Sequence, residues 1–142
     1  MRAMRDEMVY LASPYTHKDP SVEEWRYRAV LVATAILTAR GVNVFSPIVY
    51  SHHLARVLPQ QLYTHDFWLN FDKKFMDRCE VLSILSLPGW DKSDGVNTEF
   101  NYMVNKQRKP FRLCDPKDIN LYSMLGMEPS PCAFGLPGGY DA

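Results

Sequence analysis

The sequence VLSILSLPGWDKSDGVNTEF, from Val81 to Phe100, decides how this chain folds. Its first part, Val81 to Leu87, is apolar at five of seven positions, which is typical of a strand covered on both faces. Pro88 and Gly89 then end the strand, and a polar loop follows. An apolar strand, a turn and a polar loop in this order predict the edge of a parallel sheet, where active sites are often found.

A helix is predicted directly after this loop. Ser93 or Asp94 can cap it, and its apolar positions recur at helical spacing, at Val96, Phe100 and Met103. We therefore expect Glu99 in or near the first helical turn, where unpaired N–H groups and the helix dipole favour an ionised carboxylate. An acidic residue in a first turn often only stabilises its helix, and the local pattern alone favours that interpretation. The alternatives are a nucleophile, a base or an anchor for a sugar hydroxyl.

The rest of the chain alternates between strand and helix patterns. Strands are predicted at residues 8–12, 42–45 and 110–114, and helices at 20–40, 66–78 and 94–105. Strands joined by helices imply right-handed crossovers. The predicted fold class is α/β, a single-domain flavodoxin-like sandwich with a four- or five-stranded, mostly parallel sheet. The α/β domain should span 1–114, and 115–142 should form an irregular tail that packs on the domain or on a neighbouring subunit.

The segment from Ile48 to His65 has no clear period and is interpreted as a binding loop. His52 and His53 are adjacent within it, so in a helix or strand they cannot both face one metal ion, and no HExxH-like spacing accompanies them. We therefore expect no metal site and no cofactor. One of the two histidines can contact a substrate, although solvated loop positions are the more common case.

The composition excludes several classes of function. The 142 residues carry 16 basic and 16 acidic side chains, so the chain has no electrostatic signature of a partner for a nucleic acid polymer or an anionic membrane. No apolar run approaches the roughly 20 residues of a membrane-spanning helix. Cys79, Cys114 and Cys132 show no paired spacing, which indicates reduced thiols. The expectation is a cytoplasmic protein that acts on a small molecule.

Three polar segments follow predicted strands: Ser13-Pro14-Tyr15, Ser46-Pro47 and Ser93 to Glu99. Because the carboxyl ends of parallel strands share one edge, these segments should meet in one crevice. The sequence lacks GxxxxGK[ST], GxGxxG and GxSxG loops, which argues against nucleoside triphosphates, dinucleotides and serine hydrolysis. Carboxylates, hydroxyls and aromatic rings remain, and this set suits glycosyl chemistry.

Three stretches resemble the nucleoside 2-deoxyribosyltransferase superfamily: Tyr10 to Tyr15, Val44 to Ile48, and Leu87 to Val96 with Glu99. The most specific part is the Ser-x-Gly-x-x-x-Glu pattern after a buried strand. The likeness covers roughly residues 8 to 114. It is greatest to a small branch that shares the Pro-Gly-Trp turn.

This resemblance implies the roles of individual residues. Glu99 is the expected nucleophile at the anomeric carbon, and Asp72, on the preceding helix, assists it. The helix pattern alone instead favours an exposed Asp72 with an ion pair beside Lys73. The further expected substrate-binding residues are Ser93, Gly95, Tyr15, Ser13, Trp90 and Ser46, with Tyr15 or Trp90 stacking on the base.

Ser93 bears on the substrate. In the superfamily, an Asp at this position is common in members acting on free nucleosides, whereas a Ser that contacts phosphate occurs in those that hydrolyse nucleoside 5′-monophosphates. A hydroxyl beside backbone N–H groups suits a phosphate, which a carboxylate would repel. The resemblance therefore implies an N-glycosidase for nucleoside 5′-monophosphates that is a homodimer or larger homo-oligomer. The alternatives are a nucleoside 2-deoxyribosyltransferase and a non-catalytic nucleotide-binding module.

Overall fold

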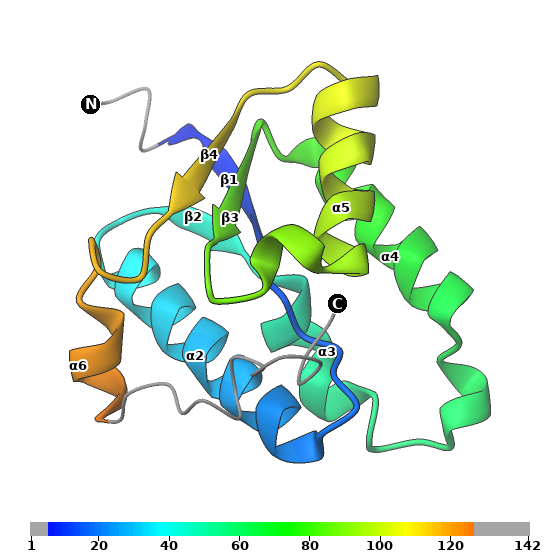
Figure 1. Cartoon of the computed structure of the whole chain (residues 1–142). Helices are drawn as coiled ribbons and strands as arrows, with labels where there is room; N and C mark the ends of the chain where they lie inside the picture. Colours follow the sequence, from blue (N-terminus) through cyan, green and yellow to red (C-terminus); the bar gives the residue numbers. More distant parts are fainter. Residues whose placement is uncertain (1–5, 127–142) are drawn as a thin grey trace.

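The computed structural model describes residues 6–126, which form four strands and five α-helices (Figure 1). The strands are β1 (Met8–Ala12), β2 (Asn43–Phe45), β3 (Val81–Leu85) and β4 (Phe111–Cys114). The helices are α2 (Pro20–Ala39), α3 (Pro47–Leu54), α4 (His65–Arg78), α5 (Asp94–Phe100) and α6 (Leu121–Leu125). Short 3₁₀ turns lie at Gln60–Leu62 and Trp90–Lys92, and α5 continues as a π-helical segment, Asn101–Lys106.

All strand pairs in the sheet are parallel, and the strand order is β2-β1-β3-β4. This arrangement confirms the predicted flavodoxin-like α/β sandwich, with four strands. The chain runs outward from β1 to β2 on one side and from β3 to β4 on the other, so the order reverses between β1 and β3. The crevice beyond the carboxyl ends of these two strands is where such sheets bind ligands.

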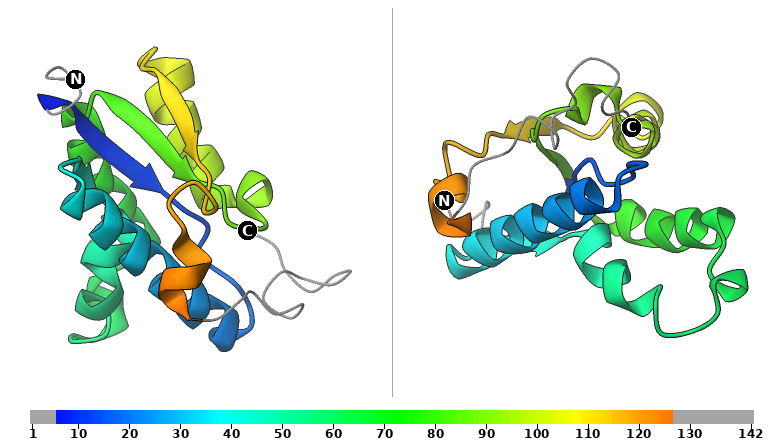
Figure 2. Two further views of the ribbon diagram at one scale, coloured as in Figure 1. Left: turned by 90° about the vertical axis from the view of Figure 1, so that its left-hand side faces the viewer. Right: turned by 60° about the horizontal axis from the view of Figure 1, so that its bottom comes forward.

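Helices cover both faces of the sheet (Figures 1 and 2). On one face, Leu11 and Leu85 pack against α2 and α6, whose buried side chains include Ala29, Ala33 and Leu121. On the other face, the remaining strand side chains pack against α4, α5 and the π-helical segment; this cluster comprises Tyr10, Ala12, Leu82, Ile84, Met76, Val96 and Met103. Because neighbouring strand residues point to opposite faces, β1 and β3 supply both cores and are almost fully buried.

The helix ends follow the predicted signals. The Asp19 carboxylate accepts a hydrogen bond from the backbone N–H of Ser21 at 2.9 Å and caps α2, and Pro20 occupies its first turn. After α2, Gly41 has φ of 89°, a left-handed conformation that favours glycine. The Ser93 hydroxyl caps α5 by accepting from the N–H of Val96 at 3.2 Å. These caps fix where the loops at the sheet edge begin and end.

Two parts of the chain differ from the sequence-based expectation. Residues 47–54, expected to be irregular, form α3, which the Ser46 hydroxyl caps by accepting from the N–H of Val49 at 3.1 Å. The expected irregular tail also includes α6, which packs beside α2 (Figure 2). Its Leu121 is fully buried. The rest of the expected tail, 127–142 with Cys132, lies outside the described residues.

Within residues 6–126, no helix is both long and apolar enough to cross a lipid bilayer. The longest of these helices, α2, exposes the charged side chains of Glu24 and Arg28. Cys79 and Cys114 are both free thiols.

Candidate active site

A cavity of about 590 Å³ lies at the carboxyl edge of the sheet, where β1 and β3 end. Its walls come from the loop after β1, from α3 and α4, and from α5 with the residue that caps it. Segments that follow β1, β2 and β3 therefore meet in one crevice, as the sequence predicted.

The α5 wall carries the polar groups that the sequence singled out. Ser93, Gly95 and Glu99 all line the cavity, together with Asp94 and Thr98. Ser93 is 3% exposed, and its hydroxyl is already used as the helix cap. Gly95 leaves room at this end, because the nearest atom to a Cβ placed on it is the Ser93 Oγ at 3.9 Å.

The position of Glu99 in α5 and the pKa of its carboxyl group both differ from the expectation. It is the sixth residue of α5 and lies in the second helical turn, so the free N–H groups of the first turn do not reach its carboxyl group. Burial of the carboxyl group instead raises the pKa of Glu99 to about 8. The expected stabilisation of an ionised Glu99 by the helix start is therefore wrong; desolvation dominates.

Tyr10 is a site residue that sequence reasoning missed. Its hydroxyl donates a hydrogen bond to Glu99 Oε2 at 2.7 Å, from the middle of β1. Burial and the nearby Glu99 carboxylate raise the pKa of Tyr10 well above its usual value, so the phenol stays protonated and remains a donor. A tyrosine inside an otherwise aliphatic buried strand needs a partner for its hydroxyl, and that signal could have pointed to this contact.

Asp72 reaches the same cavity from α4. The carboxyl group is partly buried, and desolvation raises the pKa of Asp72 to about 7. The alternative of an exposed, ion-paired Asp72 is therefore wrong. Its negative charge also contributes to the raised pKa of Glu99, so the two carboxyl groups interact electrostatically. Near neutral pH such a pair holds protons that ordinary carboxyl groups would have lost.

The α3 and α4 wall is largely apolar. Its apolar members are Pro47, Ile48, Ala55, Trp68 and Leu69, with Ser51, His52 and His65 as polar neighbours. Trp68 contacts the ring of Tyr63 at 5.1 Å between centroids, stacked at 25°. A wall with an indole ring and aliphatic carbons suits a flat, weakly polar group such as a nucleobase.

Two predicted substrate-binding residues lie elsewhere. Trp90 packs against the core cluster that contains Val96 and Met103, and Ser46 is 4% exposed and caps α3. Neither is among the described residues that line the cavity. Trp68 is the indole at this wall, and it was not among the expected substrate-binding residues.

The loop after β1 brings Ser13 and Tyr15 to the cavity, as predicted. Ser13 is 6% exposed, and its hydroxyl has no hydrogen-bond partner among the residues that the structure describes. A buried hydroxyl left without a partner at a cavity wall is available to a ligand. Tyr15 is half-buried, and desolvation raises the pKa of its phenol.

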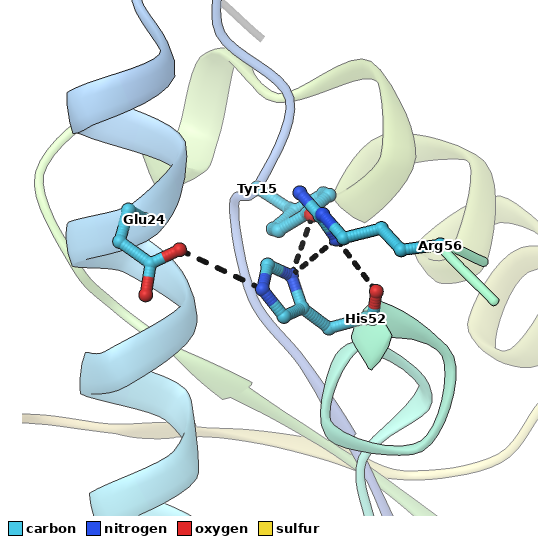
Figure 3. A network of polar contacts seen from close by, with 4 residues as sticks. All are labelled: Tyr15, Glu24, His52 and Arg56. Atoms are coloured by element: carbon cyan, nitrogen blue, oxygen red, sulfur yellow. Dashed lines mark hydrogen bonds and ion pairs between the residues drawn. The ribbon is translucent and has the colours of Figure 1, made fainter. Parts of the chain in front are cut away.

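His52 is buried rather than solvated, which corrects the preferred expectation for this residue. It is 4% exposed and contacts Tyr15, Glu24 and Arg56 (Figure 3). His53, by contrast, is exposed, as expected. In the described part of the chain, no group of three or more His, Cys, Asp or Glu side chains is arranged to hold a metal ion.

The fold and the site together define a class of protein: a flavodoxin-like α/β domain with a crevice that holds a carboxyl pair at the switch in strand order. A family model, described as a domain of unknown function (DUF1937), matches residues 7–114, and the chain belongs to this family. The matched region ends with β4 and includes all the cavity residues named above. A comparison with curated proteins found no match.

Proposed function

We propose that this protein is an N-glycosidase that cleaves the bond between base and sugar in a nucleoside 5′-monophosphate. The observation that carries the proposal is the pair of carboxyl groups, Glu99 and Asp72, in one cavity at the sheet edge. Burial raises the pKa of both, and Tyr10 donates a hydrogen bond to Glu99. The likeness to the nucleoside 2-deoxyribosyltransferase superfamily supports the same roles.

The active form of the pair carries one proton, on Asp72, while the Glu99 carboxylate accepts from Tyr10. Because the pKa of Glu99, about 8, is above that of Asp72, about 7, this is the minor of the two singly protonated forms. An oxygen of Glu99 forms a bond to C1′ as the bond between C1′ and the base nitrogen breaks. The base leaves with the electron pair and takes the proton from Asp72. Asp72, now ionised, removes a proton from water, which attacks C1′ and releases Glu99. Two carboxyl groups that share one proton near neutral pH can supply both an acid and a nucleophile.

The two ends of the cavity suggest how the substrate lies. The apolar wall of α3 and α4, with Trp68 and Ile48, suits the base. Ser93 and Gly95, at the start of α5, suit the 5′-phosphate, because a hydroxyl and backbone N–H groups can donate to it. The sugar would then lie between them, beside the carboxyl pair.

A second candidate is a nucleoside 2-deoxyribosyltransferase that moves the sugar between bases. Asp94 lines the cavity beside Ser93, and no lysine or arginine among residues 6–126 lines it. A carboxylate at this end would accept a hydrogen bond from a free 5′-hydroxyl and would repel a phosphate. Hydrolase and transferase differ in whether water or a second base receives the sugar. A nucleotide-binding module without catalysis is the remaining alternative.

The test is a panel of nucleosides and nucleoside 5′-monophosphates, with ribose and with deoxyribose, each incubated with and without an acceptor base. Chromatography measures the released base and any new nucleoside. Release of free base from the monophosphates supports the proposal, and exchange of bases on nucleosides supports the transferase. Binding of a nucleotide without either product, over long incubation, supports the non-catalytic module.

The matched variants are Glu99→Gln and Glu80→Gln. Glu99→Gln removes the nucleophile and should lower kcat by at least about a thousandfold. Glu80→Gln makes the same change at an exposed residue outside the cavity and should retain activity. Near-normal base release by Glu99→Gln would contradict the assignment of the nucleophile.

A cytoplasmic location, a small-molecule partner and a homodimer or larger homo-oligomer form part of this proposal. They rest on the composition and on the resemblance.

A further inference from the structure

The ring of His52 is fixed from several sides. It stacks on the ring of Tyr27, from α2, at 3.6 Å between centroids and 11° between planes. His52 belongs to α3, and its ring is also in edge contact with the ring of Tyr15, from the loop after β1. Three segments of the chain therefore meet at this one side chain, which lines the cavity.

The contacts of His52 determine which ring nitrogen carries the proton. Arg56 Nη1 lies 3.1 Å from His52 Nδ1 and also donates to the backbone carbonyl of His52 at 2.6 Å (Figure 3). Because a guanidinium has donors and no acceptor, Nδ1 must be the accepting nitrogen. The Tyr15 hydroxyl, 2.8 Å from the same Nδ1, is therefore also a donor. His52 is neutral, with its proton on Nε2.

The charges around His52 come from α2 and from the end of α3. Glu24 Oε1 of α2 lies 3.6 Å from Nε2, and Glu23 also lies on this helix. His53 is the next residue of α3, and Arg56 lies in the turn after this helix. Burial, followed by the positive charge of Arg56, lowers the pKa of His52, while Glu24 opposes them. These effects agree with the neutral ring that the hydrogen bonds require.

We propose that His52 is a positioning residue that holds the Tyr15 hydroxyl on the cavity wall, and that ligand binding at this wall weakens when His52 takes up a proton. The inference concerns the site of the proposed function and rests on that function only for the choice of ligand.

The physical reason lies in the single lone pair of Nδ1. A proton on Nδ1 turns this nitrogen into a donor, so the Tyr15 hydroxyl loses its acceptor and the Arg56 guanidinium faces a second positive charge. The Tyr15 side chain is then held less firmly, because Arg56 is its remaining hydrogen-bond partner in this group. A ligand must order it again, which lowers the affinity.

The first experiment needs no ligand. Imidazole ¹⁵N NMR of the whole protein, titrated between pH 4.5 and 8, reports the tautomer and pKa of His52. We expect the Nε2–H tautomer, and Tyr15→Phe should raise the pKa of His52 because the neutral ring loses a donor. An Nδ1–H tautomer, or a pKa that Tyr15→Phe leaves unchanged, overturns the proposal.

The second experiment measures binding by calorimetry, with the four deoxynucleoside 5′-monophosphates and their nucleosides as probes, at pH 5 and pH 7.5. Tyr15→Phe and His52→Leu should each weaken binding at pH 7.5 by about tenfold, the equivalent of one lost hydrogen bond. The double variant should lose no more than either single variant, because both remove one contact. Additive losses overturn the proposal.

His52→Asn separates the acceptor from the charge. Its side-chain oxygen can occupy the place of Nδ1 and cannot be protonated, so this variant should keep the affinity at pH 7.5 and lose less of it at pH 5 than the unchanged protein. His53→Asn is the matched control and should follow the unchanged protein at both pH values. If His52→Asn shows the same pH dependence as the unchanged protein, His52 is not the titrating group and the proposal fails.

The two experiments separate this inference from the proposed function. If no probe binds at any pH, the proposed function fails for these substrates. The NMR result then decides alone whether His52 positions Tyr15.

Discussion

Two of the aspartates of α4, Asp72 and Asp77, have surroundings that give them opposite properties. Asp72 faces the cavity, and desolvation raises its pKa to about 7. Asp77 is exposed and accepts hydrogen bonds from the Tyr102 hydroxyl and from Gln107 Nε2, both at 2.7 Å. These hydrogen bonds lower the pKa of Asp77. The same residue type, about one and a half turns apart on one helix, thus has a raised pKa at one place and a lowered pKa at the other.

The difference shows what makes a carboxyl group suited to proton transfer in this molecule. Donors stabilise the charged form of Asp77, whereas burial destabilises the charged form of Asp72. Glu99 experiences both effects, since Tyr10 donates to it while burial and Asp72 oppose ionisation. The pKa of a carboxyl group in this molecule therefore depends more on whether the group is buried at the cavity than on the helix that carries it.

Among the tests of this comparison, the largest expected effect comes from replacing each of the two aspartates by asparagine. Asp72→Asn removes the proton donor for the leaving base and should lower kcat by about a hundredfold or more, the usual contribution of a general acid. Asp77→Asn lies outside the cavity and should leave kcat within about twofold, because an amide oxygen can still accept from Tyr102. Steady-state kinetics with the best substrate of the panel measures both.

Equal losses in the two variants would contradict the comparison. They would mean that both aspartates act through the stability of α4. A thermal melt of each variant at the assay pH distinguishes this case, because only a folding defect lowers the melting temperature in parallel with the activity.

A somewhat smaller effect is expected when a carboxylate is added to the cavity. Ser93→Asp places a negative charge at the end proposed for the phosphate, and an aspartate can still cap α5. The ratio of kcat/KM for a 5′-monophosphate to that for its nucleoside should fall about tenfold or more, since repulsion of about 1.4 kcal/mol corresponds to a factor of ten. Ser93→Thr retains the hydroxyl and should retain the ratio. An unchanged ratio in Ser93→Asp would remove the argument for phosphate.

The sequence predicted the parts of this site that depend on local pattern. The strands, the capped start of α5 and the cavity positions of Ser13, Tyr15 and Ser93 follow from short-range signals. The helix α3 was missed, although Ser46 followed by Pro47 is a helix-start signal, because its β-branched and histidine residues have low helix propensity.

Other features of the site depend on contacts between distant residues. Tyr10 and Glu99 are 89 residues apart in the chain, and no local pattern predicts their hydrogen bond. The raised pKa of Glu99 depends on burial by the whole fold, so an argument from the helix start alone gave the wrong direction. Trp68 lies on α4 and reaches the cavity, whereas Trp90 packs against a core cluster, and the local sequence does not distinguish these two positions.

Tyr10→Phe tests the hydrogen bond that distinguishes Glu99 from Asp72. Without the donor, burial and Asp72 act on Glu99 unopposed, so its pKa should rise further. Because Glu99 has the higher pKa of the pair, the fall of kcat/KM at high pH, where the pair loses its second proton, should move upward by about one pH unit, as a hydrogen bond to a charged group can cause. A pH profile that does not move would mean that Tyr10 serves only the core.

The smallest expected effect is on stability, and it tests the raised pKa values without any substrate. In the unfolded chain Glu99 and Asp72 ionise at their ordinary pKa values, 4.5 and 3.8, whereas in the folded protein they retain protons up to about pH 8 and pH 7. The folded state therefore binds more protons between about pH 4 and pH 8, and the free energy of unfolding falls as pH rises through this range. Glu99→Gln and Asp72→Asn each remove one such group. The melting temperature of the unchanged protein, relative to that of either variant, should therefore fall by a few degrees between pH 5 and pH 8.5.

Asp77→Asn is the control. The lowered pKa of Asp77 stabilises the folded protein above the ordinary pKa of an aspartate, and this stability is lost as the pH falls. Asp77→Asn should therefore differ from the unchanged protein in the opposite direction, and the difference should change only at acid pH. If the cavity variants and Asp77→Asn follow the same curve from pH 5 to pH 8.5, burial does not separate the two kinds of aspartate, and the acid in the proposed reaction has no physical basis.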